Sequence, residues 1–189
     1  MNCYLLAGGR STRMGRSKLD LEIGGATFLA RVRAVAREAF DDVRAVQRPG
    51  GETIDGLPTI REAPHDDEAP IFGVLAALRH ASRKCFILAV DYPLMSADLL
   101  RFLCERGEQA KAPLVVPRWD GKLQMLCAVW SPELRPLVAL RIAERRYDLR
   151  AFASEAEVID EAELRARFGG EPLMNVNTPE ELESAARLI

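Results

Sequence analysis

The sequence predicts an α/β fold, a doubly wound, mostly parallel mixed sheet with helices on both of its faces. Short apolar runs alternate with amphipathic helical patterns from end to end, as in chains built from βαβ units. The run 85–90 is apolar at every position, which is expected of a central strand covered on both faces. No repeat or interdomain linker is visible, so residues 1–189 are expected to form one domain.

Strand and helix patterns alternate in the first half of the chain. Apolar runs predict strands over residues 3–7, 43–46 and 57–60. The apolar spacing over 27–40 predicts a helix with one stripe facing the sheet. Pro70 then opens a helix that runs to about His80, because the first helical position needs no N–H donor.

The second half continues the alternation. Apolar runs predict strands over 85–90, 114–116 and 126–130. An Asp-Gly turn signal within 119–122 indicates that the last two of these strands pair with each other. Ser96 can cap a helix that runs to about Arg106. A threonine, a proline and a glutamate in 178–181 form a capping box, which predicts a helix to the end of the chain.

Charge and cysteine usage narrow the class of protein. The net charge of -2 offers no overall attraction to nucleic acid or to an anionic membrane. No apolar run has the length of a membrane span, and the apolar start is too short for a signal peptide. The four cysteines form no CxxC pair, which disfavours zinc, and Cys3, Cys85 and Cys127 are expected to be buried thiols. We therefore expect a cytoplasmic protein.

A glycine-rich basic loop follows the first predicted strand and carries the strongest functional signal. Residues 6–18 read LAGGRSTRMGRSK, at the sheet edge where ligands bind in open parallel sheets. Gly8 and Gly9 allow the backbone to approach a phosphate, and Arg13 and Lys18 add positive charge. The loop is neither a P-loop nor a dinucleotide fingerprint. A solvated surface turn is the alternative, but glycines and cations together favour a polyanion site.

Asp91 stands directly after the buried strand 85–90, at the same edge of the sheet. Mg²⁺ is commonly held in nucleotide sites by one or two carboxylates together with phosphate oxygens, so this position suits a metal–nucleotide complex. A carboxylate that accepts hydrogen bonds from turn N–H groups is the alternative. Taken alone, the residue does not decide between them.

These segments resemble one known family along nearly the whole chain. The pattern LAGGxxxRMGxxK over 6–18 is similar to the signature of the molybdenum cofactor guanylyltransferases, which have a nucleotide-diphospho-sugar transferase-like fold. The segment APIFGV (69–74) is similar to the family's GPxxGI-type turn, with Ala69 at a usual glycine, and DYPL (91–94) is similar to its DxPxL. The segments 121–130 and 175–182 resemble its Q-P-L-x-A-x-[YW] strand and its NxNTPEEL ending.

The resemblance implies a Mg²⁺-dependent enzyme that transfers GMP from GTP to the phosphate of molybdopterin. Its GTP-binding positions fall here on Leu6, Ala7, Gly8, Gly9, Arg13, Lys18, Gln47, Glu62 and Asp91. The catalytic group would be Arg13, Lys18 and Asp91, with Asp91 holding the metal. Molybdopterin-binding positions fall on Gln124, Asn175 and Asn177. Protein partners of this family would be molybdoenzyme apoproteins or other cofactor-biosynthesis proteins.

Two pairs of these residues keep alternatives open. Gln47 and Glu62 stand for a family asparagine and aspartate that contact the base and ribose, and either could be a solvated loop residue. Asn175 and Asn177 are expected on a short strand with both side chains on one side, or as a pair that shapes the turn before the last helix.

The tryptophan and histidine residues give weaker evidence about function than the segments above. Trp119 is expected to face the pterin, whereas Trp130 is expected to pack in the core. Neither His65 nor His80 has a setting that suggests a covalent enzyme intermediate.

Three other functions remain as alternatives. The related cytidylyltransferases carry alanine in place of the first glycine, so Gly8 favours guanine over cytosine. A sugar-phosphate nucleotidyltransferase of the same fold would usually be longer. A non-catalytic carrier of the finished cofactor would need neither a triphosphate site nor a metal site. Arg13, Lys18 and Asp91 together predict both sites, which argues against a carrier.

Overall fold

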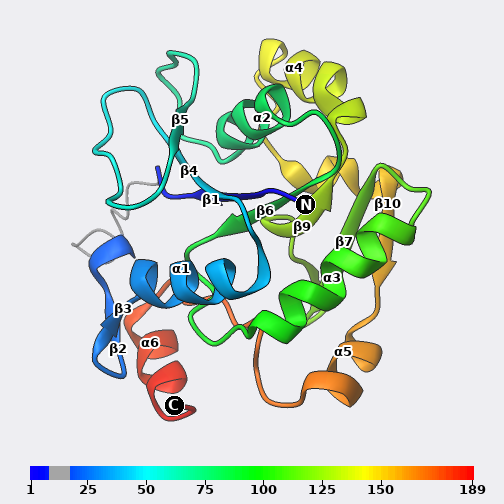
Figure 1. Cartoon of the computed structure of the whole chain (residues 1–189). Coiled ribbons are helices and arrows are strands. Elements are labelled where there is room, and N and C mark those ends of the chain that lie inside the picture. The colour runs from blue at the N-terminus through cyan, green and yellow to red at the C-terminus, as the bar shows by residue number, and fades with distance from the viewer. Residues whose placement is uncertain (9–17) are drawn as a thin grey trace.

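The computed structural model of the chain describes residues 1–8 and 18–189 and has a mixed sheet at its centre (Figure 1). The strands follow the order β10-β7-β9-β6-β1-β4-β5, and β8 pairs with β7. Their bounds are β1 Cys3–Leu6, β4 Val43–Gln47, β5 Thr59–Arg61, β6 Cys85–Ala89, β7 Leu114–Trp119, β8 Lys122–Leu123, β9 Cys127–Trp130 and β10 Ala156–Ile159. Strand β9 is antiparallel to both of its neighbours, while β1 is parallel to β4 and β6. The predicted mostly parallel mixed sheet is confirmed.

Helices cover both faces of the sheet, as a doubly wound fold requires (Figure 1). Their bounds are α1 Phe28–Ala39, α2 Ile71–His80, α3 Ala97–Gln109, α4 Arg135–Ala143, α5 Glu161–Phe168 and α6 Pro179–Ala186. One apolar cluster joins α1, α3 and α5 to the sheet, and a second joins α2 and α4 to it. Neighbouring strand residues divide between the clusters, with Leu5 in the first and Tyr4 in the second, because strand side chains alternate.

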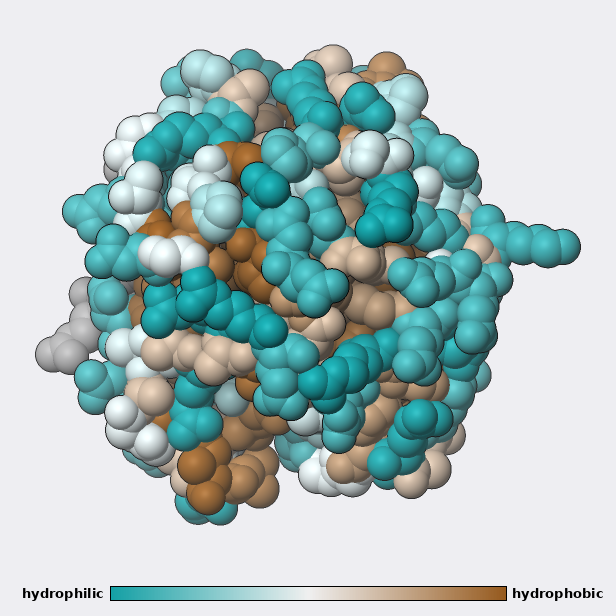
Figure 2. All heavy atoms as spheres, in the orientation of Figure 1, coloured by the Kyte–Doolittle hydropathy of each residue, from teal (hydrophilic) through white to brown (hydrophobic). Residues whose placement is uncertain are grey.

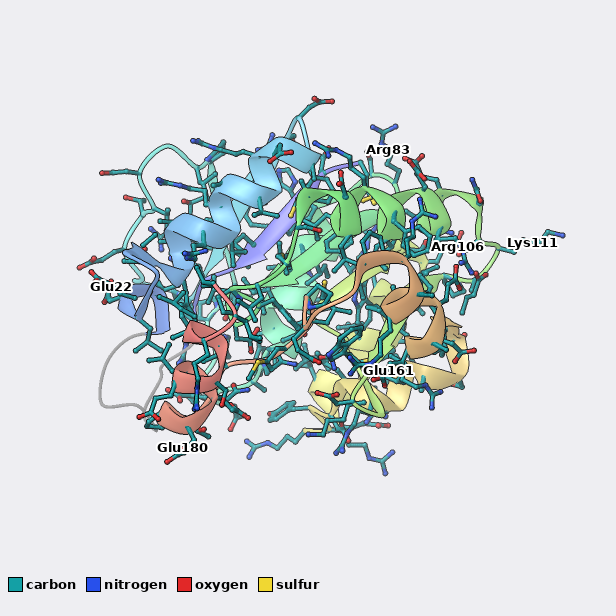
Figure 3. The ribbon with its side chains drawn as sticks, turned by 90° about the horizontal axis from the view of Figure 1, so that it is seen from below. Glu22, Arg83, Arg106, Lys111, Glu161 and Glu180 are labelled. Atoms are coloured by element: carbon teal, nitrogen blue, oxygen red, sulfur yellow. The ribbon has the colours of Figure 1, made fainter. Side chains whose placement is uncertain are left out.

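The view from below shows α1 and α3 side by side across one face of the sheet (Figure 3). Arg106 on α3 pairs with Glu163 on α5 at 2.6 Å and with Glu157 on β10 at 3.3 Å. Glu161, at the start of α5, accepts a hydrogen bond from the Gly121 N–H at 3.2 Å. These polar contacts hold α5 against the outer strands.

Predicted helix starts are confirmed at three places. The side chains of Thr27 and Ser96 accept hydrogen bonds from the N–H groups of Ala30 and Leu99. Thr178 and Glu181 form the predicted capping box at the start of α6. Each cap satisfies an N–H that the first helical turn leaves without an intrahelical partner.

The structure corrects several sequence-based expectations. The Asp-Gly turn, with φ of 49° at Asp120 and 68° at Gly121, joins β7 to the short β8 and not directly to β9. The predicted pairing of β7 with β9 is nevertheless confirmed. The third predicted strand lies at 59–61 instead of 57–60. Residues 175–177 form no strand, and the backbone bond from the Val176 N–H to the Asp91 carbonyl places this segment beside the end of β6.

Several elements were not expected from the sequence. They are a small hairpin of β2 (Glu22–Ile23) and β3 (Ala26–Thr27), the helices α4 and α5, the edge strand β10, and the 3-10 turns η1 (Lys18–Asp20), η2 (Pro132–Leu134) and η3 (Leu149–Glu155). A third apolar cluster, around Phe28 and Val176, ties the hairpin to the segment before α6. The C-terminal part of the chain therefore folds back beside its beginning.

The face in Figure 2 is mostly hydrophilic, with apolar side chains visible around β4 and β5. A further apolar spot lies at the end marked C in Figure 1, where Leu188 and Ile189 are 55% and 56% exposed. Within the described residues, no helix has the length and apolar character to cross a membrane.

The buried cysteines predict slow thiol chemistry in the folded protein. Cys3, Cys85 and Cys127 are buried, as predicted, and burial raises the pKa of Cys85 to about 12. Burial also raises the pKa of the half-buried Cys104 to about 12. Because the thiolate is the reactive form, alkylation at pH 8 should be at least about a thousandfold slower in the native than in the unfolded protein. Mass spectrometry after timed labelling measures this.

The control for that labelling is the chain in guanidinium, where four labels per chain are expected. Partial labelling of native protein should begin at Cys104, the one of the four that is not fully buried. Rapid native labelling of Cys85 would contradict the packing of β6 described above.

Candidate functional site

Two cavities lie side by side at the carboxyl ends of the parallel strands. The first has a volume of about 300 Å³ and is lined by Leu6, Ala7, Gly8, Leu19, Arg48, Glu62, His65, Glu68, Ala69, Pro70, Ala89, Val90, Asp91 and Leu126. The second has a volume of about 310 Å³ and is lined by Pro70, Asp91, Tyr92, Leu123, Gln124, Met125, Leu126, Tyr147, Asp148, Leu149 and Asn175. Pro70, Asp91 and Leu126 line both cavities. This edge of an open sheet is where such folds bind ligands.

Asp91 lies at the boundary between the cavities, close to where the sequence placed it. It follows β6, whose Ala89 N–H donates to the Leu126 carbonyl at 2.7 Å. The Asp91 carbonyl accepts a hydrogen bond from the Val176 N–H at 3.0 Å. That bond brings Asn175 beside the end of the central strand. A carboxylate in this position can contact ligands in both cavities.

Glycine at position 8 allows the ends of β1 and β4 to approach closely. A Cβ atom there would lie 3.0 Å from the Arg48 backbone nitrogen and 2.9 Å from the Arg48 Cγ. Gly8 and Leu19 both line the first cavity, so the chain leaves and re-enters the site on either side of the basic loop. Gly9, Arg13 and the Lys18 side chain belong to this loop and lie outside the described residues.

Leu6, Ala7, Gly8 and Glu62 all line the first cavity, where the resemblance expects GTP. Gln47 does not line it. Its side chain is 5% exposed, and its Oε1 lies beside Gly51, 3.1 Å from where a Cβ would be. Strand side chains alternate, so the next residue, Arg48, lines the cavity instead. The Arg48 Nη1 lies 2.8 Å from Glu68 Oε1, across the 62–69 loop.

The loop after β5 brings a histidine to the first cavity that the sequence did not mark. His65 Nε2 lies 2.6 Å from Glu62 Oε2, and its Nδ1 lies 2.7 Å from the Asp67 carbonyl oxygen. The imidazole stacks on Phe72 of α2, with the ring centres 3.7 Å apart and the planes inclined by 6°. The one sequence feature consistent with the contact between Glu62 and His65 is their i,i+3 spacing.

In the second cavity, Gln124 lies near its predicted place but is already fully hydrogen-bonded. It is 5% exposed, and its Oε1 accepts from Asn175 Nδ2 at 2.7 Å and from the Tyr92 hydroxyl at 3.2 Å. Its Nε2 donates to the backbone carbonyls of Trp119 and Lys122. Burial raises the pKa of Tyr92 well above its usual range, so the phenol remains a donor. Gln124 therefore orients Asn175, which reaches the cavity.

Asn177 does not line either cavity, in contrast to Asn175. The Asn177 N–H donates to Glu181 Oε2 at 2.6 Å, at the start of α6. Because no strand forms over 175–177, the two side chains do not share a sheet face. The turn-shaping alternative describes this backbone contact better.

Trp119 does not face the second cavity, contrary to prediction. It is 1% exposed, its Nε1 donates to Glu171 Oε2 at 3.1 Å, and the Arg165 guanidinium lies 4.1 Å from its ring centre. Residues from α5 and the segment after it thus cover the indole. Trp130 is fully buried, as predicted.

Tyr147 and Asp148 line the second cavity from the segment between α4 and η3. The Tyr147 hydroxyl donates to the Asp67 carboxylate, which raises the pKa of Tyr147 and connects this segment to the loop that carries His65. Hydrogen bonds from Arg150 hold the pKa of Asp148 below its usual range. Sequence spacing offers no signal for either residue, since they are far from the other lining segments in the chain.

The arrangement suits two ligands that meet at one carboxylate. Within residues 1–8 and 18–189, no three His, Cys, Asp or Glu side chains gather as a metal cage. A single carboxylate beside a cavity still fits a hard divalent cation whose other ligands are phosphate oxygens and water. The site can therefore hold a polyanion on one side of Asp91 and an acceptor molecule on the other.

Known proteins resemble this chain over most of its length. Residues 3–159 match the model of a family described as MobA-like NTP transferase domain. A "probable molybdenum cofactor guanylyltransferase" from Aquifex aeolicus is 32% identical over 186 residues, covering 96% of this chain and 88% of the relative. One from Pelotomaculum thermopropionicum is 34% identical over 188 residues, covering 96% and 89%.

A solved structure has the same fold. Molybdopterin-guanine dinucleotide biosynthesis protein A from Archaeoglobus fulgidus superposes with a TM-score of 0.85 at 22% identity, covering 100% of this chain and 98% of that one. At this identity the likeness bears on the fold alone.

Proposed function

Since this chain belongs to the MobA-like NTP transferase family, together with relatives named as molybdenum cofactor guanylyltransferases, we propose that it transfers GMP from GTP to the phosphate of molybdopterin. It is a nucleotidyltransferase, and the product of the proposed reaction is the guanine dinucleotide form of the cofactor. The observation that carries the proposal is the position of Asp91 on the wall shared by the two cavities.

In the proposed reaction, a phosphate oxygen of molybdopterin attacks the α-phosphorus of GTP. The bond from the α-phosphorus to the oxygen that bridges to the β-phosphorus breaks, and pyrophosphate leaves with that oxygen. Both reactants are anionic, so the main barriers are charge repulsion and alignment. Cations and oriented N–H donors lower both barriers more directly than a strong general base would.

We assign the triphosphate to the first cavity and the pterin to the second. Gly8 lets the nucleotide approach the backbone at the end of β1, and Arg13 and Lys18 of the basic loop would offset the phosphate charge. Asn175 faces the second cavity and would contact the acceptor. Glu62 lies on the wall of the first cavity and would accept hydrogen bonds from the nucleoside.

Mg²⁺ is the proposed cofactor, with Asp91 as its protein ligand. The donor set fits, because Mg²⁺ in nucleotide sites is bound by one or two carboxylates and completed by phosphate oxygens and water. When bound, it would neutralise charge on the transferred and leaving phosphates. We also propose a cytoplasmic location, which suits the four free cysteines. Molybdoenzyme apoproteins or other cofactor-biosynthesis proteins are the proposed protein partners.

The first test compares nucleotides by calorimetry on the wild-type chain, with GTP, CTP and ATP in the presence and absence of Mg²⁺. We expect GTP to bind at least about tenfold more tightly than CTP or ATP, because buried polar groups matched to one base penalise another. Removal of Mg²⁺ should weaken GTP binding. Incubation with GTP and molybdopterin should then release pyrophosphate and yield the dinucleotide.

Each other outcome favours a different function. Preference for CTP would replace the proposal by a cytidylyltransferase. Absence of binding by any nucleotide, with molybdopterin still bound, would replace it by a carrier of the cofactor. GTP turnover with a sugar phosphate but not with molybdopterin would assign the second cavity to another acceptor.

A further inference from the structure

His65 and Glu62 form a nearly buried pair on the wall of the first cavity. The two side chains are 8% and 9% exposed, and the nitrogen and oxygen between them lie 2.6 Å apart. Such a short contact is typical of a charge-assisted hydrogen bond. Neither the family resemblance nor the sequence patterns above assigned a role to His65.

The proton count at this pair follows from its partners. His65 Nδ1 faces the Asp67 carbonyl oxygen at 2.7 Å, and a carbonyl oxygen can only accept. His65 Nε2 faces a carboxylate oxygen, which also accepts when it is ionised. A neutral imidazole carries one N–H and can satisfy only one of these acceptors. With Glu62 ionised, both contacts need an N–H on the ring, and only the imidazolium form has two.

The surroundings of the ring favour that form. The imidazole lies flat on Phe72, at 3.7 Å between ring centres, and a cation is attracted to the face of an aromatic ring. The Asp67 carboxylate, which accepts from Tyr147, belongs to the same loop. Among the described residues that line the first cavity, the one arginine, Arg48, is paired with Glu68 at 2.8 Å. The described charged side chains that line this cavity with His65 are therefore mainly acidic.

Glu62 is held at one carboxylate oxygen, and the other lies in the space above Gly73. Oε2 contacts His65, while Oε1 lies 3.1 Å from the position that a Cβ on Gly73 would occupy, over the first turn of α2. A helix N-terminus favours negative charge. The absence of a side chain at Gly73 leaves room for the carboxylate there. The contact with His65 is thus the one that orients this carboxylate on the cavity wall.

We propose that His65 is a positioning residue, an imidazolium that holds Glu62 as an oriented anion so that its carboxylate can select guanine. A carboxylate can accept from N1–H and the 2-amino group of guanine together. Adenine and cytosine lack this pair of adjacent donors. The inference rests on the proposed use of GTP, and it adds the residue that determines how Glu62 is presented.

The protonation state can be measured without any nucleotide. The chain has two histidines, and His80, whose Nδ1 lies 2.8 Å from the Tyr4 hydroxyl, serves as the internal reference. Long-range ¹H–¹⁵N spectra at pH 7, assigned with His65→Gln, should show both nitrogens of the His65 ring protonated. An unprotonated nitrogen in that ring would overturn the proposal, whichever nucleotide the protein binds.

A double-mutant cycle tests whether His65 affects GTP binding through Glu62. Since removing an orienting partner commonly costs 10-fold to 100-fold, we expect His65→Ala to weaken GTP binding by roughly tenfold. Its effect on ITP, which lacks the 2-amino group, should be smaller. In a Glu62→Gln background, His65→Ala should cause less than about a twofold further change, because residues that act as one unit are not additive.

The control is His80→Gln, at an exposed histidine outside both cavities, which should leave GTP binding unchanged. Equal weakening by His65→Ala with and without Glu62 would overturn the proposal, as would an unchanged ratio of GTP to ITP affinity. If the wild type showed no preference for GTP, the proposed function would fail instead. The nitrogen spectra would still report on the His65–Glu62 pair.

Discussion

Replacing Asp91 with asparagine is expected to lower kcat/KM for nucleotide transfer on the order of a thousandfold, as loss of a preorganised electrostatic group commonly does. The substitution keeps the size of the side chain and removes the negative charge proposed to hold Mg²⁺. It should leave the backbone bond from the Val176 N–H to the Asp91 carbonyl in place. The loss should therefore be in catalysis and not in folding.

Initial rates of pyrophosphate release at GTP concentrations well below KM, with molybdopterin saturating, measure kcat/KM for GTP, and a Mg²⁺ titration separates the causes of the loss. If Asp91 holds the metal, the variant should need more Mg²⁺ to reach half of its residual rate. Asp98→Asn is a matched control, since Asp98 is an exposed aspartate on α3 that pairs with Arg101 at 2.8 Å. Its activity should equal that of the wild type. Retention of activity within about threefold in Asp91→Asn would remove Asp91 from the proposed mechanism.

The strands that set up the site were predictable because their signals are local. The uniformly apolar β6 and the apolar run before Gly8 identify central strands. Parallel strands end at one edge, which brings Gly8, Glu62 and Asp91 to the first cavity. Helix starts were predictable for the same reason, since a cap and its N–H partner lie within three residues in Thr27, Ser96 and Thr178.

The remaining features depend on contacts between distant segments. Trp119 is expected from the sequence to face the pterin, but residues 165 and 171 cover it. Tyr147 reaches the site through the Asp67 carboxylate, 80 positions earlier in the chain. Gln47 and Arg48 show a simpler difficulty, because a one-residue change in a strand exchanges its faces. Sequence patterns alone do not determine that register.

The polar wall of the first cavity illustrates why sites are harder to predict than folds. Glu62 is identified from the sequence only by resemblance, and the sequence setting of His65 suggests no covalent intermediate. In the structure, Phe72 from α2 and the Asp67 carbonyl fix the His65 ring, and the ring fixes Glu62. The proposed role of His65 follows from the packing of α2 against the loop after β5, and such packing leaves no periodic signal in the sequence.

Replacing Gly8 with alanine is expected to weaken GTP binding by about a hundredfold, since a displacement of about 1 Å in a positioned site can cost that much. The added Cβ would lie 3.0 Å from the Arg48 nitrogen and 2.9 Å from its Cγ, closer than ordinary contact. Either the end of β1 or Arg48 must move, and both line the first cavity. Calorimetry with GTP and Mg²⁺ measures the loss, and thermal unfolding shows whether the fold persists.

Arg48→Ala distinguishes the two close contacts of the added Cβ, one with the Arg48 side chain and one with its backbone nitrogen. The substitution removes Cγ but leaves the backbone nitrogen, so Gly8→Ala with Arg48→Ala should recover part of the affinity relative to Arg48→Ala alone. Full recovery would mean that the Arg48 side chain alone requires glycine at position 8. An unchanged GTP affinity in Gly8→Ala itself would contradict the close approach of β1 to β4. It would also remove the structural reason for glycine at position 8, where the related cytidylyltransferases carry alanine. Base selection would then be assigned to the cavity wall formed by Glu62 and His65.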